Sequence, residues 1–117
     1  MKNIYFRYLQ FVSSDAIHQS KQEVLSSTAI LLLNRIAVKE YEEKPMNVNQ
    51  AMTIQALGSP SNLHRKLVEL REAGMIEVKS VGKNHRTKYL FISQAAYDYF
   101  QIKSEAMVKA IEKPSQV

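Results

Sequence analysis

The chain has 117 residues, of which 45% are hydrophobic and 23% charged, and its net charge is +5, as in an ordinary globular protein. It contains no cysteine, which excludes a disulfide framework, a cysteine-ligated zinc site and a thiol nucleophile. Because residues 1–11 lack the apolar run of a signal peptide and no stretch approaches about 18 apolar residues, we expect a cytoplasmic protein without membrane contact.

The N-terminal part, residues 1–25, reads as a helical arm followed by a connector. Apolar residues would lie on most of the circumference of a helix over residues 2–12: Ile4, Tyr5, Phe6, Tyr8, Leu9, Phe11 and Val12. Such a helix is expected to be buried on more than one side, either against its own domain or against a partner subunit. Residues 13–25 are polar and predict a connector with at most a short helical turn.

A long helix is expected from residue 26 to about residue 43, because Ser26, Ser27 and Thr28 offer N-caps and Pro45 follows its end. Its buried stripe is predicted from apolar residues at helical spacing: Ile30, Leu33, Ile36, Ala37 and Tyr41.

The next segment, residues 46–58, predicts a brief extended entry and a short helix. Met46 and Val48 form the entry, and Asn49 is the expected N-cap. The predicted inward-facing residues are Ala51, Met52 and Ala56. Gly58 is expected to close the helix, since glycine adopts the left-handed conformation of many helix ends.

Residues 59–73 give the clearest helix of the chain. Ser59 is the predicted N-cap, and Pro60 takes the first helical position, where a missing N–H has no cost. Its buried stripe is Leu63, Leu67, Leu70 and Ala73, and Gly74 ends it. The opposite face is polar and basic in the first two turns.

Two strands and a last helix complete the chain. Residues 75–81 alternate apolar and polar, residues 82–85 predict a turn, and residues 86–92 predict the returning strand. Ser93 is the expected cap of a helix with a stripe of Ala96, Phe100, Met107 and Ile111, stopped by Pro114. A polar tail follows.

Most of the positive charge lies in one stretch. Residues 59–92 carry +4 of the +5, whereas residues 26–58 and 93–117 are each neutral. A concentrated basic charge favours a polyanionic partner, with a solvated basic face as the alternative. The histidines His18, His64 and His85 do not have the spacing of a metal site, so no metal or other cofactor is expected.

The order of helix, brief strand, short helix, sharp turn, second helix and hairpin resembles the MarR-type winged helix-turn-helix transcriptional regulators. The residues that carry this resemblance are Val48-Asn49-Gln50, Gly58-Ser59-Pro60-Ser61, Leu63, Leu67, Leu70, Gly74-Met75-Ile76 and Arg86-Thr87-Lys88. The predicted fold class is mainly α with a small β-hairpin (α+β), a winged helix-turn-helix. The predicted division is an arm and connector over 1–25, the winged domain over 26–92, and a C-terminal helix and tail over 93–117.

The resemblance implies sequence-specific binding of double-stranded DNA by a homodimer, with the 59–73 helix in the major groove and the 75–92 hairpin as the wing. The candidate DNA-contacting residues are Ser59, Ser61, Asn62, His64, Arg65, Lys66, Lys83, His85, Arg86 and Lys88. Side chains at the start of the helix would read bases, since Asn pairs with adenine and Arg with guanine. The wing cations would hold backbone phosphates, and Lys66 and Lys88 can instead extend over apolar surface.

Two other functions remain open. A winged helix can dock another protein, which Glu69 and Glu72 on the exposed face of the 59–73 helix and the apolar N-terminal arm would support. A plasmid or phage replication or partition protein can share the same fold. Because no glycine-rich phosphate loop, nucleophile elbow or carboxylate pair is present, we expect no enzyme activity. No small-molecule effector is assigned from the sequence.

Overall fold

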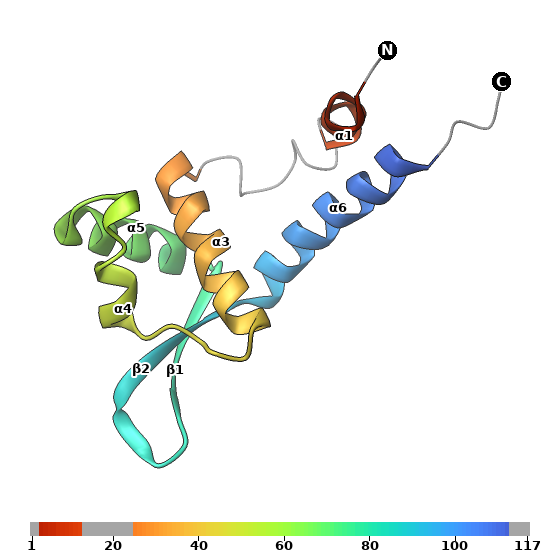
Figure 1. The fold of residues 1–117 in the computed structure, drawn as a ribbon. Coiled ribbons are helices and arrows are strands. Elements are labelled where there is room, and N and C mark those ends of the chain that lie inside the picture. Colours follow the sequence, from red (N-terminus) through yellow and green to blue (C-terminus); the bar gives the residue numbers. More distant parts are fainter. Residues whose placement is uncertain (1–2, 13–24, 113–117) are drawn as a thin grey trace, which may run out of the picture. The chain divides into compact units, whose positions relative to one another are not determined.

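The computed structural model describes residues 3–12 and 25–112 (Figure 1). The chain divides into two compact units, one of residues 24–96 and one of residues 1–23 with 97–117. The larger unit holds α3 (Ser27–Tyr41), α4 (Val48–Met52), the 3₁₀ helix η2 (Gln55–Leu57), α5 (Pro60–Glu72), β1 (Ile76–Val81) and β2 (Asn84–Ile92). The smaller unit contains α1 (Ile4–Val12) and most of α6 (Gln94–Ile111).

The larger unit is a winged helix-turn-helix, mainly α with a small β-hairpin, as the sequence predicted. In Figure 1 the helices α3, α4 and α5 lie together, and the hairpin extends away from them. Their shared core is formed by fully buried side chains from each part: Leu32, Leu33, Ile36, Ala51, Leu63, Leu70, Met75 and Leu90. Each large apolar side chain in such a core stabilises the fold by roughly 1.5–3 kcal/mol.

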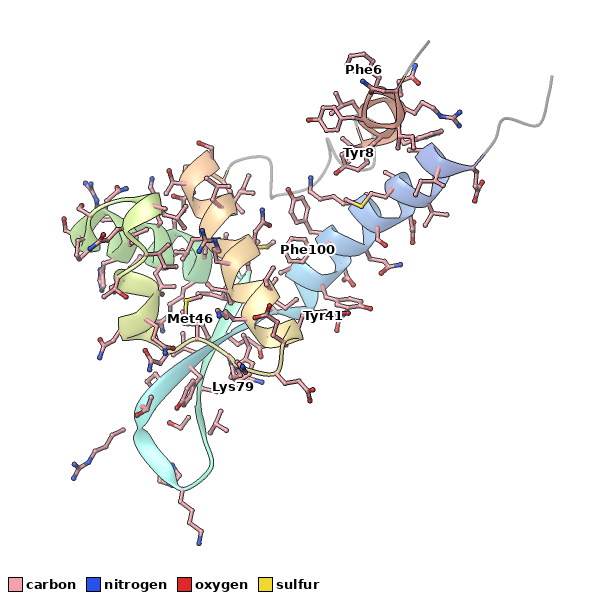
Figure 2. All side chains as sticks on the ribbon, viewed as in Figure 1. Phe6, Tyr8, Tyr41, Met46, Lys79 and Phe100 are labelled. Carbon is pink, nitrogen blue, oxygen red and sulfur yellow. The ribbon has the colours of Figure 1, made fainter. Side chains whose placement is uncertain are left out.

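Helix α3 begins after Ser26, whose hydroxyl accepts a hydrogen bond from the Ala29 N–H at 3.3 Å, as a predicted N-cap should. Its buried stripe differs from the predicted one. Ala29 and Leu32 are buried beside Leu33 and Ile36, whereas Tyr41 is 88% exposed. Figure 2 labels Tyr41. Residues 30–33 are all apolar and lie on several faces of α3. Packing against the neighbouring helices therefore decides which face of α3 is buried.

The cap of α4 is Asn47 and not Asn49. The Asn47 side chain accepts from the Gln50 N–H at 2.8 Å, and the Gln50 side chain accepts from the Asn47 N–H at 2.9 Å, which is a capping box. Ala51 is buried as predicted, but Ala56 is exposed. It lies in η2, because the chain leaves α4 after Met52 and tightens into a separate 3₁₀ turn.

Helix α5 matches its prediction closely. Ser59 caps it, Pro60 begins it, and Leu63, Leu67 and Leu70 are buried. The Ala73 N–H bonds the Glu69 carbonyl at 3.0 Å, and Gly74 follows with φ of 72°. The leucine stripe therefore fixes which face of α5 points outward.

The wing is an antiparallel pair whose register includes Ile76 opposite Ile92 and Val78 opposite Leu90. Its loop is shorter than predicted, because Val81 already pairs with Asn84 and leaves Gly82 and Lys83 as the turn. The predicted extended entry to α4 joins this sheet only as a single bridge between Asn47 and Tyr89. The Leu90 N–H also donates to the Met46 carbonyl at 2.8 Å, which attaches the wing to the helices.

Hydrogen bonds made by Ile92 and Ser93 fix the base of the wing. The Glu40 carboxylate of α3 accepts from the Ile92 N–H at 2.8 Å. The Ser93 hydroxyl accepts from the Ala96 N–H at 3.1 Å, which confirms the predicted cap of α6, and donates to the Gly74 carbonyl at 2.7 Å.

In the smaller unit, the predicted stripe of α6 is wrong in its second half. Ala106 and Ala110 are buried, whereas Met107 and Ile111 are 51% and 68% exposed. Arg7 of α1 donates to the carbonyl oxygens of Lys109 and Glu112 at 3.4 and 2.7 Å. Small side chains, and not the larger ones of the predicted stripe, therefore occupy the buried positions in this half of α6.

Within a single copy the N-terminal helix α1 has no buried residue, so it is not buried against its own domain, and its burial against a partner subunit stays a prediction. Its large apolar side chains are exposed: Ile4, Tyr5, Phe6, Leu9 and Phe11. Figure 2 labels Phe6 and Tyr8 on this helix. Most of the predicted connector, at 13–24, and the predicted Pro114 stop and tail lie outside the described residues.

Candidate nucleic-acid interface

The first turn of α5 presents a compact polar surface. The Ser59 hydroxyl accepts from the Asn62 N–H at 3.3 Å and lies 3.5 Å from the Ser61 hydroxyl. Both serines are exposed. Ser59 thus combines its capping role with an accessible hydroxyl at a helix N-terminus, where unpaired N–H groups favour anions.

Asn62 and Arg65 form a pair on the outer face of α5. The Arg65 guanidinium donates to the Asn62 side-chain oxygen at 3.2 Å, three residues along the helix. Asn62 is half-buried, and its amide nitrogen lies 3.1 Å from the position that a Cβ on Gly58 would occupy. Because Gly58 has no side chain, the Asn62 amide can lie next to it. The oxygen of the same amide accepts the hydrogen bond from Arg65 and so orients the guanidinium.

Lys66 differs from its neighbours, because a carboxylate on the same helix holds it. Its ammonium lies 3.5 Å from Glu69, and its side chain is 25% exposed. Glu69 also accepts from the Ser26 N–H at 2.7 Å and from the Ser26 hydroxyl at 3.0 Å. Lys66 is therefore drawn towards the scaffold. Glu69, expected on the exposed face, is instead partly buried at the start of α3.

The hydrogen bond from the Ser26 N–H is the largest cause that holds the pKa of Glu69 below its ordinary value. The Ser26 hydroxyl and the Lys66 charge act in the same direction, and burial opposes them. The lowered pKa thus favours the ionised form of Glu69, which is the form that accepts both hydrogen bonds from Ser26.

The wing carries the other candidate cations. Lys83 is exposed in the turn, and His85, Arg86 and Lys88 are exposed along β2. The Lys88 ammonium donates to the Ser80 hydroxyl at 3.1 Å, and that hydroxyl donates to the His85 carbonyl at 3.3 Å. Lys88 is therefore anchored across the hairpin, with its charge still exposed.

A groove of about 340 Å³ joins the wing to the start of α4. It is lined by Asn47, Val48, Asn49, Arg86, Thr87 and Lys88. Two of the predicted residues, Arg86 and Lys88, thus share a concave surface with a helix start. His64 lies exposed on α5 and does not line this groove.

The sequence reasoning did not select Asn49 or Thr87 as site residues. The sequence does contain a signal for the position of Asn49, because Asn47 and Gln50 have the spacing of a capping box that would begin α4 at Val48. With the cap at Asn47, Asn49 becomes the second residue of α4 and lies exposed at its first turn. Thr87 offered no such signal, since only the tertiary fold brings β2 beside α4.

Within residues 3–12 and 25–112, no three His, Cys, Asp or Glu side chains gather in a way that could hold a metal ion. His18, one of the three histidines considered from the sequence, lies outside those ranges. In the same ranges, no helix has the length and apolar character needed to cross a membrane.

The fold and this basic, polar surface define a winged-helix protein. No family model matches the sequence, and no curated protein matches it. Among solved structures, one described as "Structure of Disulfide formed AbfR" is similar, with a TM-score of 0.51 and 17% sequence identity. The match covers 97% of this chain and 71% of that one, and it shows a shared fold. This chain has no cysteine, so the disulfide of that protein has no counterpart here.

Proposed function

We propose that this protein is a sequence-specific, double-stranded DNA-binding transcriptional regulator of the MarR-like type. The observation that carries the proposal is the Asn62–Arg65 pair at the start of α5, on the same unit as the wing cations. A major groove about 12 Å wide admits a helix, and Arg and Asn are the residues that most often read guanine and adenine.

In the proposed complex, the two parts of the surface have different roles. Asn62 and Arg65 contact base edges, with His64 beside them. Ser59 and Ser61 contact a phosphate at the helix N-terminus. Lys83, His85, Arg86 and Lys88 of the wing contact the backbone, and Lys66 contributes less because Glu69 holds it.

The groove between α4 and β2 would hold a further phosphate. Arg86 and Lys88 supply positive charge there, and the exposed Asn49 can donate its side-chain amide. Phosphate contacts at the start of α5 and between α4 and β2 would together set the register with which α5 enters the major groove of the DNA.

We propose further that the protein acts as a homodimer through its smaller unit. Large apolar side chains are exposed on α1, as described above, and on α6, where they are Tyr97, Met107, Val108 and Ile111. If these side chains form one patch, as proposed, they mark an interaction site and not a solvated face. Two copies would place their recognition helices about 34–36 Å apart, one turn of DNA.

The central test selects bound duplexes from a random pool and then measures affinity for the selected site against salt. Three exposed cations per copy that are proposed to contact phosphates (Lys83, Arg86 and Lys88) predict a slope of log affinity against log salt of up to about −2.7 per copy. Failure to enrich any sequence would remove the base-reading role. The absence of affinity for any duplex at low salt would favour the protein-docking alternative, which the exposed Val68, Arg71 and Glu72 of α5 could serve.

A further inference from the structure

The hydrogen bond between Asn62 and Arg65 has a direction that restricts which base pair the two residues read. An arginine side chain only donates hydrogen bonds, so the Asn62 amide must turn its oxygen, and not its nitrogen, towards Arg65. The structure has this arrangement, with the guanidinium donating to the oxygen at 3.2 Å. The amide nitrogen lies beside Gly58, 3.1 Å from where a Cβ on that glycine would be. Both ends of the Asn62 amide therefore have defined neighbours.

This arrangement does not suit the usual pairing of asparagine with adenine. That pairing is bidentate, because the amide nitrogen donates to adenine N7 while the oxygen accepts from the adenine N6 amino group. Both ends of the amide must then face one base edge. In Asn62 the oxygen is shared with Arg65 and the nitrogen lies beside Gly58. An amide oxygen has two lone pairs, so Asn62 keeps one acceptor position for DNA.

Arg65 supplies the donors next to this acceptor. A guanidinium has five N–H groups, and Asn62 uses one of them. Arg65 is exposed and forms no salt bridge with any residue of the described ranges, so its other N–H groups are accessible. The two side chains thus present a row of N–H donors followed, 3.2 Å away, by one oxygen acceptor.

A G·C base pair has the matching row of groups in the major groove. It presents the acceptors N7 and O6 of guanine and, next to O6, the N4 amino donor of cytosine. We propose that Arg65 and Asn62 together read one G·C pair, with Arg65 donating to guanine and Asn62 accepting from cytosine N4. An A·T pair would place the adenine amino group opposite an arginine N–H and thymine O4 opposite the Asn62 oxygen. This inference rests on the proposed function, because it requires α5 to lie in the major groove.

Gly58 is the residue on which the direction of the Asn62 amide depends. It has φ of 145° and no side chain, so the amide nitrogen can lie against it. A Cβ at 3.1 Å from that nitrogen would displace the amide and, with it, the oxygen that orients Arg65. Gly58 thus acts as a positioning residue, which contacts no base itself and influences base reading through Asn62.

The test compares the sequences that different variants of the full-length protein select from a random pool of duplexes. Wild type, Arg65→Ala and Asn62→Ala are selected in parallel, with His64→Ala as an exposed control on the same helix. We expect Arg65→Ala and Asn62→Ala to lose about tenfold or more in preference at the same base pair, a G·C pair that His64→Ala still prefers. Losses at two different pairs, or at an A·T pair in Asn62→Ala, would overturn the shared reading and leave the proposed function intact. If the wild type enriches no sequence, the proposed function fails and the inference fails with it.

Two further variants distinguish base reading from a purely structural role. Asn62→Asp keeps an oxygen acceptor and removes the N–H donor, so it should bind all DNA more weakly through charge repulsion and still prefer the same G·C pair. Gly58→Ala should lose that preference. Gly82→Ala, which also has a positive φ but open space around the added Cβ, should keep it. Thermal unfolding verifies that each variant is folded. Loss of the G·C preference in Asn62→Asp, or its full retention in Gly58→Ala, would contradict the proposed roles.

Discussion

The carboxylate of Glu69 caps a helix other than its own. It accepts from the N–H and the hydroxyl of Ser26 at 2.7 and 3.0 Å, and that hydroxyl in turn accepts from Ala29 at 3.3 Å. Glu69 and Ser26 are 43 positions apart, so their contact joins α5 to the start of α3. The orientation of the proposed recognition helix thus depends on a partly buried contact at the start of α3.

Replacing Glu69 by glutamine should lower the free energy of unfolding by about 1–2 kcal/mol, because hydrogen bonds to a charged acceptor and a helix cap are weakened together. Chemical denaturation at neutral pH measures this. Glu72→Gln is the matched control, since it changes the same charge on the exposed side of the same helix and should have little effect. Equal losses in the two variants would contradict the capping role.

The lowered pKa of Glu69 also predicts a pH dependence. A carboxyl group whose pKa is lower in the folded state stabilises that state at pH values above its unfolded pKa, about 4.3. This contribution is lost as the pH falls through the lower, folded value. The difference in unfolding free energy between wild type and Glu69→Gln should therefore be constant near neutral pH and shrink below about pH 4. A difference that grows on acidification would have the wrong sign.

Gly58→Ala should affect both stability and the position of Asn62. Gly58 has φ of 145°, which disfavours any L side chain, and the new Cβ would lie 3.1 Å from the Asn62 amide nitrogen. We expect a loss of about 1 kcal/mol or more and a shifted Asn62 side-chain amide signal in NMR. Gly82→Ala is the control, because it has φ of 70° but no atom within 4 Å of the added Cβ. It should lose similar stability and leave the Asn62 signal in place.

Arg65→Ala and Lys83→Ala should separate base reading from backbone binding. Loss of a base-reading arginine costs about 1–3 kcal/mol on the preferred sequence and much less on random DNA. Loss of a phosphate contact weakens both alike and reduces the salt slope by about 1. Fluorescence anisotropy with the selected and a scrambled duplex gives all four affinities. If Arg65→Ala weakens both duplexes equally, the guanidinium does not read sequence.

The exposed apolar side chains of the smaller unit should determine the oligomeric state. Phe6→Glu and Ile111→Glu each place a charge at a position that is 54% or 68% exposed. If this surface forms the dimer, the double variant should sediment as a monomer at concentrations at which the wild type is dimeric. Tyr41→Glu, which changes an 88% exposed residue of α3, should leave the assembly unchanged. A wild type that sediments as a monomer would remove the dimer proposal.

The sequence predicts secondary structure correctly where each residue interacts with partners a few positions away along the chain. Ser59, Pro60 and the three leucines defined α5, because caps, proline and helical spacing act within a few residues. The prediction was less successful where a helix had apolar residues on several sides. Tyr41 and Met107 were assigned to buried stripes and are exposed, since helical spacing alone does not choose among competing faces. The predicted domain boundaries and the roles of the site residues stay predictions.

The sequence by itself determined the winged helix-turn-helix order, the start and outward face of α5, and the concentration of basic charge in residues 59–92. Those properties follow from short-range backbone and side-chain preferences. Only the tertiary structure decided that Glu69 joins Ser26, that Lys66 turns towards the scaffold, and that Asn49 shares a groove with Arg86. Glu69 meets Ser26, and Asn49 meets Arg86, only because the helices and the hairpin pack together. Lys66 reaches Glu69 three residues along the same helix, and it follows that carboxylate towards the scaffold.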